Sequence, residues 1–215
     1  MPNRINLPVF LSLSLPKELI GTNQAQDLYD FLASIVKAIA ISGGNIVFGG
    51  HPTITPLIHK MVISLGVSYP CIHLFQLERF KNDAPPEIGD ERVFQLTWYK
   101  DHASIDIALG NMRAVMARQA QAAVFLGGNR KSITHTPGIK DEYSKFISYH
   151  PKGPAYLLGF LGGTTTEIIS DIEKQGISEP NGLNEKEANI IHHSTNIDLI
   201  TSLILADLAK TTRCP

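Results

Sequence analysis

Short apolar runs alternate with longer segments of helical periodicity along most of the chain. The apolar runs are rich in Val, Ile, Leu and Phe, residues that suit a strand. They occupy Pro8–Ser12, Asn45–Phe48, Cys71–Leu77, Val93–Trp98, Ala122–Leu126 and Ala155–Phe160. Several are apolar at consecutive positions, which is typical of strands buried on both faces. The pattern therefore predicts a parallel sheet covered on both sides.

The segments between these runs carry apolar residues three and four positions apart. In the first of them, Leu28, Phe31, Leu32 and Ile35 share one helical face. The helices predicted in this way cover Gln24–Ile41, Thr53–Leu65, Ser104–Gln119, Lys140–Ser148 and Thr164–Lys174. Strands that alternate with helices indicate βαβ units. We therefore expect an α/β fold with a single, doubly wound, mainly parallel sheet and helices on both faces.

Two polar segments, Lys81–Arg92 and Gly176–Gly182, are predicted to be loops. A helical tail follows the second loop, with apolar residues at helical spacing from Ile197 to Leu208. We expect one domain over residues 1–176 and a C-terminal helical extension, residues 177–215, packed on the same domain. The apolar face of Ile197–Leu208 either forms a two-fold interface with a second copy or packs on its own sheet.

The composition excludes several classes of protein. With 43% hydrophobic and 18% charged residues, the 215-residue chain can bury one sizeable core and is not globally disordered. Nineteen basic and twenty acidic residues give a net charge of −1, which disfavours nucleic-acid and membrane-surface binding. No apolar run suits a transmembrane helix or a signal peptide, and the two cysteines, Cys71 and Cys214, are far apart. We expect a cytoplasmic protein.

Three of the apolar runs end in Gly-Gly followed by small or hydroxyl residues: NIVFGGHPTITPL, AAVFLGGN and YLLGFLGGTTTE. In an open α/β sheet the carboxyl ends of parallel strands form the crevice in which ligands bind. Glycine there lets backbone N–H groups approach a ligand, and a helix that starts just afterwards attracts anions. The three loops together predict a site for a phosphate or a nucleotide.

Known chemical motifs are missing from these loops. None of them continues as a P-loop or matches the G-x-G-x-x-G dinucleotide fingerprint. The chain has no G-x-S-x-G nucleophile elbow. Its eight histidines show no metal-ligand spacing. We therefore expect no metal and no cofactor.

The second glycine loop runs on through a basic excursion, Arg130 and Lys131, to a helix that opens at Pro137. Glu142 lies in the first turn of this helix, where a carboxylate complements the helix dipole. Alternatively, Glu142 faces the crevice and binds a sugar hydroxyl or transfers a proton. Arg113, on the preceding predicted helix, is either a surface residue or a phosphate ligand.

These residues resemble a known family. LGG at Leu126–Gly128, followed after an insert by GIKDE at Gly138–Glu142, is similar to the Gly-Gly and Gly-Thr-x-x-Glu signature of the LOG ("lonely guy") phosphoribohydrolases. LOG belongs to the wider SLOG (Smf/DprA and LOG) superfamily, in which a similar arginine-bearing helix precedes the motif. The first and third loops resemble the nucleotide-sensor branch found beside TIR and other NAD-processing domains in bacterial conflict systems. The resemblance covers roughly Pro8 to Lys174.

The resemblance implies a Rossmann-like fold that binds a nucleotide or an ADP-ribose-type ligand. It implies that Arg113 pairs with a phosphate and that Glu142 contacts a ribose. The ligand-binding residues carried over in this way are Ser12, Ser14, Gly49, Gly50, His51, Thr53, Arg113, Gly127, Gly128, Gly138, Glu142, Gly162, Gly163 and Thr164. It also implies a homodimer or higher homo-oligomer and an effector protein as a partner.

Two functions remain open at this point. The first is a sensor module that recognises its ligand without turnover. The second is a LOG-like hydrolase of an N-glycosidic bond, in which Glu142 would stabilise the transition state or activate water and Arg113 would hold the 5′-phosphate. The chain departs from the LOG pattern by having Leu126 in place of Pro, Ile139 in place of Thr, and the insert. A DNA-processing role is disfavoured by the near-neutral charge.

Overall fold

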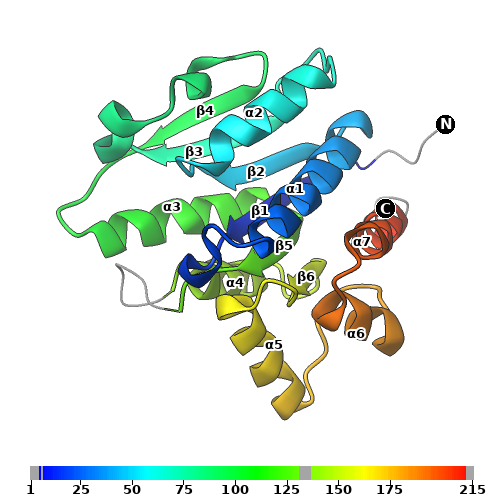
Figure 1. The fold of residues 1–215 in the computed structure, drawn as a ribbon. Helices are drawn as coiled ribbons and strands as arrows, with labels where there is room; N and C mark the ends of the chain where they lie inside the picture. Colours follow the sequence, from blue (N-terminus) through cyan, green and yellow to red (C-terminus); the bar gives the residue numbers. More distant parts are fainter. Residues whose placement is uncertain (1–4, 6, 131–136, 212–215) are drawn as a thin grey trace.

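The structure is a computed structural model that describes residues 5, 7–130 and 137–211 (Figure 1). Six strands form one sheet in the order β4-β3-β2-β1-β5-β6, and every pairing between neighbours is parallel. The strands are β1 (Pro8–Ser14), β2 (Asn45–Gly49), β3 (Ile72–Leu77), β4 (Phe94–Tyr99), β5 (Ala122–Gly127) and β6 (Ala155–Leu158). The prediction of a Rossmann-like parallel sheet is confirmed.

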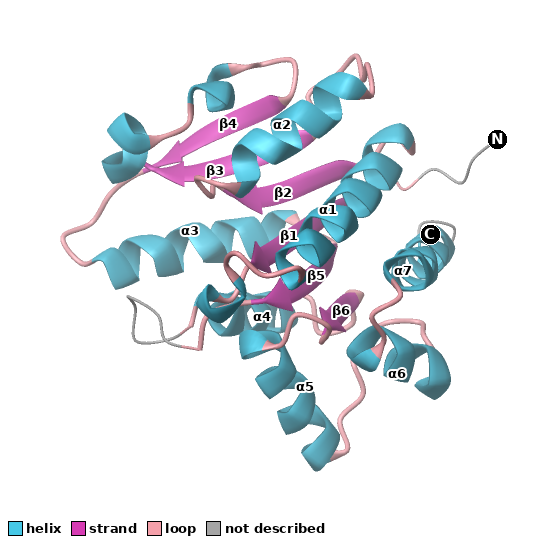
Figure 2. Ribbon diagram, viewed as in Figure 1, coloured by secondary structure: helices cyan, strands magenta, loops and turns pink. Residues whose placement is uncertain are grey.

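Helices cover both faces of this sheet (Figure 2). One buried apolar cluster joins the sheet to α1 (Gln24–Ile41), α2 (Ile54–Ser64), α6 (Glu185–His193) and α7 (Ile197–Thr211). A second cluster, on the opposite face, joins it to α3 (Ile105–Gln119), α4 (Gly138–Tyr149) and α5 (Gly163–Gln175). The strands β1, β2, β3, β5 and β6 are largely buried on both sides, as their consecutive apolar residues predict, whereas the edge strand β4 is partly exposed.

The strand order places a switch point next to β1. The chain adds β2, β3 and β4 outward on one side of β1, and then returns to lay β5 on its other side. The connections that leave β1 and β5 therefore diverge, which opens a crevice beyond the carboxyl ends of these two strands. This topology positions the candidate site described below.

Some elements differ from the sequence-based expectation. The strand expected to reach Phe160 ends at Leu158, because α6 crosses there: a Cβ on Gly159 would lie 2.0 Å from the His192 carbonyl oxygen. The expected loop 81–92 contains parts of two 3-10 helices, Glu78–Asp83 and Pro86–Gly89. A third 3-10 helix spans Lys17–Leu19. The helical tail is two helices, α6 and α7.

The C-terminal helices pack against the main sheet. Ile200, Ile204 and Leu208 of α7 are fully buried in the cluster that contains α1. Asp207, only 1% exposed, accepts hydrogen bonds from the Tyr156 hydroxyl of β6 and from the Gly182 N–H, both at 2.9 Å. The apolar face of α7 is thus occupied within the chain and is not a free two-fold interface. The homo-oligomer expected from the resemblance stays a prediction.

None of the described helices is both long enough and apolar enough to cross a membrane.

Tyr156→Phe tests how α7 is attached. The substitution removes a buried hydrogen bond to a carboxyl group, and we expect it to lower the free energy of unfolding by about 1.5–3 kcal/mol. Denaturant unfolding measures this change. Tyr149→Phe is the control, because the Tyr149 hydroxyl accepts only an exposed hydrogen bond from Arg118, and its cost should stay within about 0.5 kcal/mol. Equal costs for the two variants would contradict the described packing.

Candidate functional site

A cavity of about 500 Å³ opens at the carboxyl ends of β1, β2 and β3, beside the switch point. Helices α3 and α4, together with residues of the 3-10 helices Lys17–Leu19 and Glu78–Asp83, line other parts of it. This volume lies within the range of pockets that bury small organic ligands, roughly 300–1,000 Å³. Its polar lining includes Ser12, Ser14, Lys17, His51, Gln76, Asp83, Arg113, Asn129 and Glu142.

Three polar side chains from distant segments meet at one wall of the cavity. The Ser12 hydroxyl, at the end of β1, donates a hydrogen bond to Glu142 Oε2 in the first turns of α4. Arg113 Nε of α3 donates to Glu142 Oε1 at 3.2 Å. Each carboxyl oxygen of Glu142 therefore already has one fixed donor. The arrangement holds the carboxyl group in one orientation while it remains 17% exposed toward the cavity.

The charged side chains around Arg113 form ion pairs. Arg113 Nη1 lies 3.2 Å from Asp141 Oδ2, and the Lys145 ammonium donates to the other oxygen of Asp141. Two cations thus face the two carboxyl groups of Asp141 and Glu142. Among the described residues, no hydrogen bond uses Arg113 Nη2, which lies against Gly138 at the start of α4. This nitrogen is available for an incoming anion.

Burial raises the pKa of Glu142 above its ordinary value of 4.5. Removal of the carboxylate from water penalises its charged form, and the neighbouring Asp141 adds to this effect. The charge of Arg113 and the hydrogen bond from Ser12 act in the opposite direction but do not cancel it. Burial in the folded protein therefore shifts the ionisation equilibrium of Glu142 toward the protonated form.

In the first glycine loop, the side chain of His51 hydrogen-bonds to backbone N–H groups of the same segment. His51 Nδ1 accepts hydrogen bonds from the backbone N–H groups of Thr53 at 3.2 Å and Ile54 at 3.4 Å. The imidazole thus takes the capping place at the start of α2. The neutral ring must then carry its proton on Nε2, and burial lowers the pKa of His51, which favours this neutral form. The Thr53 hydroxyl does not cap the helix, and Thr53 is exposed.

Hydrogen bonds from the third glycine loop hold the second glycine loop in place. The Thr164 hydroxyl donates to the Asn129 carbonyl oxygen and the Thr165 hydroxyl donates to that of Gly127, both at 3.0 Å. The Thr164 N–H also donates to the Gly128 carbonyl oxygen at 3.1 Å. The Gly-Gly-Thr segment at the start of α5 therefore holds the loop that lines the cavity. The segment does not line the cavity itself.

Gly127 lets the second loop turn across the end of β1. Its φ is +75°, a region that L side chains rarely adopt, and a Cβ would lie 2.2 Å from the Ser14 carbonyl oxygen. The Gly128 N–H donates to that same oxygen at 2.8 Å. This N–H is consequently satisfied within the protein.

Gln76, at the end of β3, was not among the residues expected from the sequence. It is 8% exposed and lines the cavity. Its amide makes no hydrogen bond with any described residue. Gly50 makes room for it, because a Cβ there would lie 2.9 Å from Gln76 Oε1. A polar residue near the end of the otherwise apolar run CIHLFQL was the available signal. Phe80, Leu109 and Met112 contribute apolar side chains to the same cavity.

The structure divides the expected site residues into two groups. The cavity is lined by Ser12, Ser14, Gly49, Gly50, His51, Arg113, Gly128, Gly138 and Glu142. The other group lies outside the lining and consists of Thr53, Gly127, Gly162, Gly163 and Thr164. Lys131 of the basic insert and Cys214 lie outside the described residues.

An all-parallel doubly wound sheet with a cavity at its switch point defines a Rossmann-like protein, with the cavity at the place where this fold binds ligands. The model of the SLOG cluster3 family matches residues 25–193. The chain belongs to this family, which confirms the superfamily to which its motifs are similar.

Comparison with solved structures confirms the fold. The X-ray structure of the protein TM1055 superimposes with a TM-score of 0.55 and 16% sequence identity, over 92% of this chain and 98% of that one. At this identity the likeness concerns the fold alone. A search of curated protein sequences found no match.

The raised pKa of Glu142 predicts a pH-dependent cost to stability. Folding favours the protonated carboxyl, so this contribution to stability is present below about pH 4.5 and is lost as pH rises through the higher pKa of the folded state. Glu142→Gln should remove the loss and raise the Tm at pH 8, by about 2–4 °C for each kcal/mol relieved. The benefit should shrink toward pH 4.

Ser12→Ala is the matched variant, and its expected effect on the Tm is opposite to that of Glu142→Gln. The Ser12 hydrogen bond lowers the pKa of Glu142, so its removal should raise that pKa further and steepen the fall in Tm between pH 5 and pH 8. Melting curves at several pH values measure both variants. A Glu142→Gln protein that melts below the parent at pH 8 would contradict this account.

Proposed function

We propose that this protein binds a nucleotide or ADP-ribose-type ligand in the cavity and recognises it without turnover. In this role it is the sensor module of a bacterial defence or NAD-signalling system. One observation carries the proposal: β1, α3 and α4 bring Ser12, Arg113 and Glu142 to a single cavity wall at the switch point. Membership of the SLOG cluster3 family supports it.

The ribose of the ligand lies against Glu142. A carboxyl group can accept several hydrogen bonds at once, and each oxygen of Glu142 currently holds one donor from the protein. Vicinal hydroxyls can therefore add to the existing bonds without displacing Ser12 or Arg113. A sugar hydroxyl that donates to the buried carboxyl would also offset the cost of its burial.

The phosphate groups lie between Arg113 and the start of α4. Arg113 Nη2 has no hydrogen-bond partner among the described residues and lies beside Gly138. The N-terminus of α4 adds unpaired N–H groups and partial positive charge at the same place. Lys17 and Asn129 line the cavity as well and suit a second phosphate. A diphosphate is therefore accommodated better than a single sugar.

The base lies against the apolar side chains of Phe80, Leu109 and Met112, which line the cavity. Gln76 lines the same cavity, and its amide offers one donor and one acceptor in a plane, the geometry with which glutamine pairs to the edge of adenine. Because the Gln76 side chain lines the cavity and makes no hydrogen bond with a described residue, its amide can pair with a base that enters there. We therefore assign an adenine base to the ligand.

The fixed orientation of the Glu142 carboxyl group favours recognition without turnover. Both of its oxygens are held by protein donors, and Ile139 occupies the position at which the LOG signature has Thr. The raised pKa of Glu142 favours the alternative, N-glycosidic hydrolysis, because a carboxyl group with a raised pKa is better suited to general acid catalysis than an ordinary one. The ligand experiment separates the two functions.

The experiment incubates the protein with AMP, ADP-ribose, cyclic ADP-ribose isomers and NAD, and records thermal shift and product chromatography on the same samples. We expect ADP-ribose or a cyclic isomer to raise the Tm by mass action and to be recovered intact. Arg113→Lys should weaken binding at least about tenfold, because lysine lacks the planar guanidinium. Arg118→Lys, on the same helix but exposed at the Tyr149 ring, is the control and should bind normally.

Two outcomes would overturn this proposal. Release of free base from AMP or NAD that disappears in Glu142→Gln would establish the hydrolase. No Tm shift with any of the four ligand types would mean that the cavity does not take an adenosine phosphate.

Gln76→Met tests the assignment of the base. Methionine is similar in size to glutamine but lacks the amide donor and acceptor. The same change should weaken ADP-ribose binding about tenfold, which is 1.4 kcal/mol. Ribose 5-phosphate, which has no base, should bind the variant and the parent equally. A variant that loses both ligands to the same degree would contradict a role in reading the base.

A further inference from the structure

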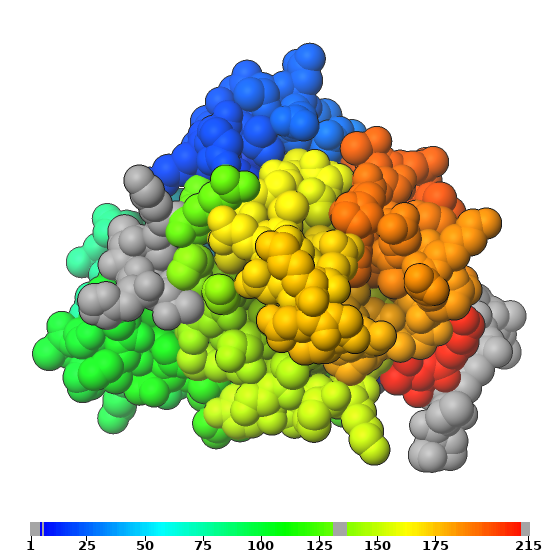
Figure 3. Space-filling model, turned by 90° about the horizontal axis from the view of Figure 1, so that it is seen from below, coloured from blue at the N-terminus to red at the C-terminus, as the bar shows by residue number. Residues whose placement is uncertain are grey.

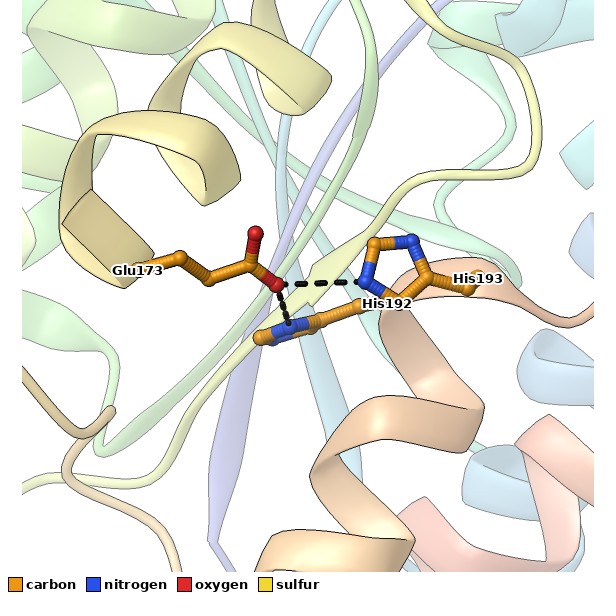
Figure 4. A group of neighbouring side chains, drawn as sticks. All are labelled: Glu173, His192 and His193. Atoms are coloured by element: carbon orange, nitrogen blue, oxygen red, sulfur yellow. Dashed lines mark hydrogen bonds and ion pairs between the residues drawn. The ribbon is translucent and has the colours of Figure 1, made fainter. Parts of the chain in front are cut away.

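A second group of polar side chains lies away from the cavity, where the ends of α5 and α6 meet. Glu173 belongs to the last turn of α5, and His192 and His193 are the last two residues of α6. None of the three lines the cavity. Figure 3 shows the α5 and α6 segments side by side on one face of the molecule. Figure 4 shows both imidazole rings directed at the same carboxyl oxygen of Glu173.

The spacing of the donor atoms suits a small divalent cation. Glu173 Oε1 lies 3.1 Å from His193 Nε2 and 3.5 Å from His192 Nδ1. All three donor atoms lie within 4.8 Å of one another. Zinc bonds of 2.0–2.2 Å in tetrahedral geometry separate neighbouring ligand atoms by about 3.3–3.5 Å. The 3.5 Å separation already matches such a site, the 3.1 Å separation is slightly shorter, and small rotations of the rings would adjust it and the third.

A buried carboxyl group fixes the orientation of His192 from the other side. His192 Nε2 lies 2.8 Å from Glu179 Oε2, and the Glu179 side chain is only 2% exposed. The other oxygen of Glu179 accepts a hydrogen bond from the Leu157 N–H at 2.9 Å. When Nε2–H donates to Glu179, the Nδ1 lone pair points toward Glu173. A carboxylate behind a histidine in this way is the usual outer support of a metal-ligating imidazole.

We propose that Glu173, His192 and His193 form a zinc site with a fourth position open to water. Two imidazoles and one carboxylate are the donor set that zinc takes in sites with three protein ligands. Glu173 and His193 are about half exposed, at 48% and 53%, so an ion can enter from solvent. The alternative is that no metal ion binds, and that protonation of the histidines lets the three side chains form ion pairs.

The zinc site would fasten the C-terminal helices to the domain. The ion joins the end of α5 to the end of α6, and the start of α5 carries Thr164 and Thr165, which support the loop at Gly127–Asn129. Zinc binding would therefore stabilise the extension directly and the cavity-lining loop at the far end of the same helix. This role is independent of the ligand proposed for the cavity.

The experiment titrates tag-free, chelator-treated protein with ZnCl₂ by calorimetry and follows the Tm. We expect one equivalent of zinc to bind and to raise the Tm. Glu173→Gln and His193→Gln should each weaken binding at least tenfold. The controls are Glu185→Gln, at the exposed start of α6, and His102→Gln, an exposed histidine on a different element; both should bind zinc like the parent protein.

Co²⁺ in place of zinc provides a second readout that does not depend on stability. The parent protein should show the visible absorption of a four-coordinate site, and Glu173→Gln should not. The proposal is overturned if the parent protein binds no zinc. It is equally overturned if both Glu173→Gln and His193→Gln keep the affinity of the parent, because the ion would then lie elsewhere.

Discussion

The position of one carboxyl group organises the candidate site. Glu142 lies beside the switch point of the sheet, where it meets a hydroxyl from β1 and a guanidinium from α3. Its burial is costly, and the pKa of Glu142 rises because Ser12 and Arg113 compensate only in part. A fold that keeps a carboxyl group at such a place has a polar surface prepared for a ligand. The rest of the cavity is arranged around that surface.

The glycine loops share one sequence pattern but serve different purposes. The first loop reaches the cavity, and its histidine satisfies the N–H groups at the start of α2. The second loop lines the cavity, while the third holds the second through Thr164 and Thr165. The anion site that we propose therefore lies at the start of α4, beside Arg113, and is not spread over three equivalent helix ends.

The fold could be predicted well from the sequence, because the hydrophobic patterns that identify strands and helices are local. Runs rich in Val, Ile, Leu and Phe identified all six strands, and the segments of helical periodicity between them identified the helices of the domain. The end of β6 was placed too late, because it depends on a close contact between Gly159 and the end of α6. The same holds for the site: Gly-Gly after a strand is visible in the sequence, but which loop faces the cavity depends on packing. Gln76 was missed because a single polar residue in a strand is ambiguous until its surroundings are known.

The most direct test of the central claim is a crystal structure of the protein with ADP-ribose. The account predicts that the ribose hydroxyls lie within hydrogen-bond distance of Glu142, that a phosphate lies against Arg113 Nη2 at the start of α4, and that the adenine edge meets the Gln76 amide. A ligand bound with its ribose away from Glu142, or outside the cavity, would contradict it.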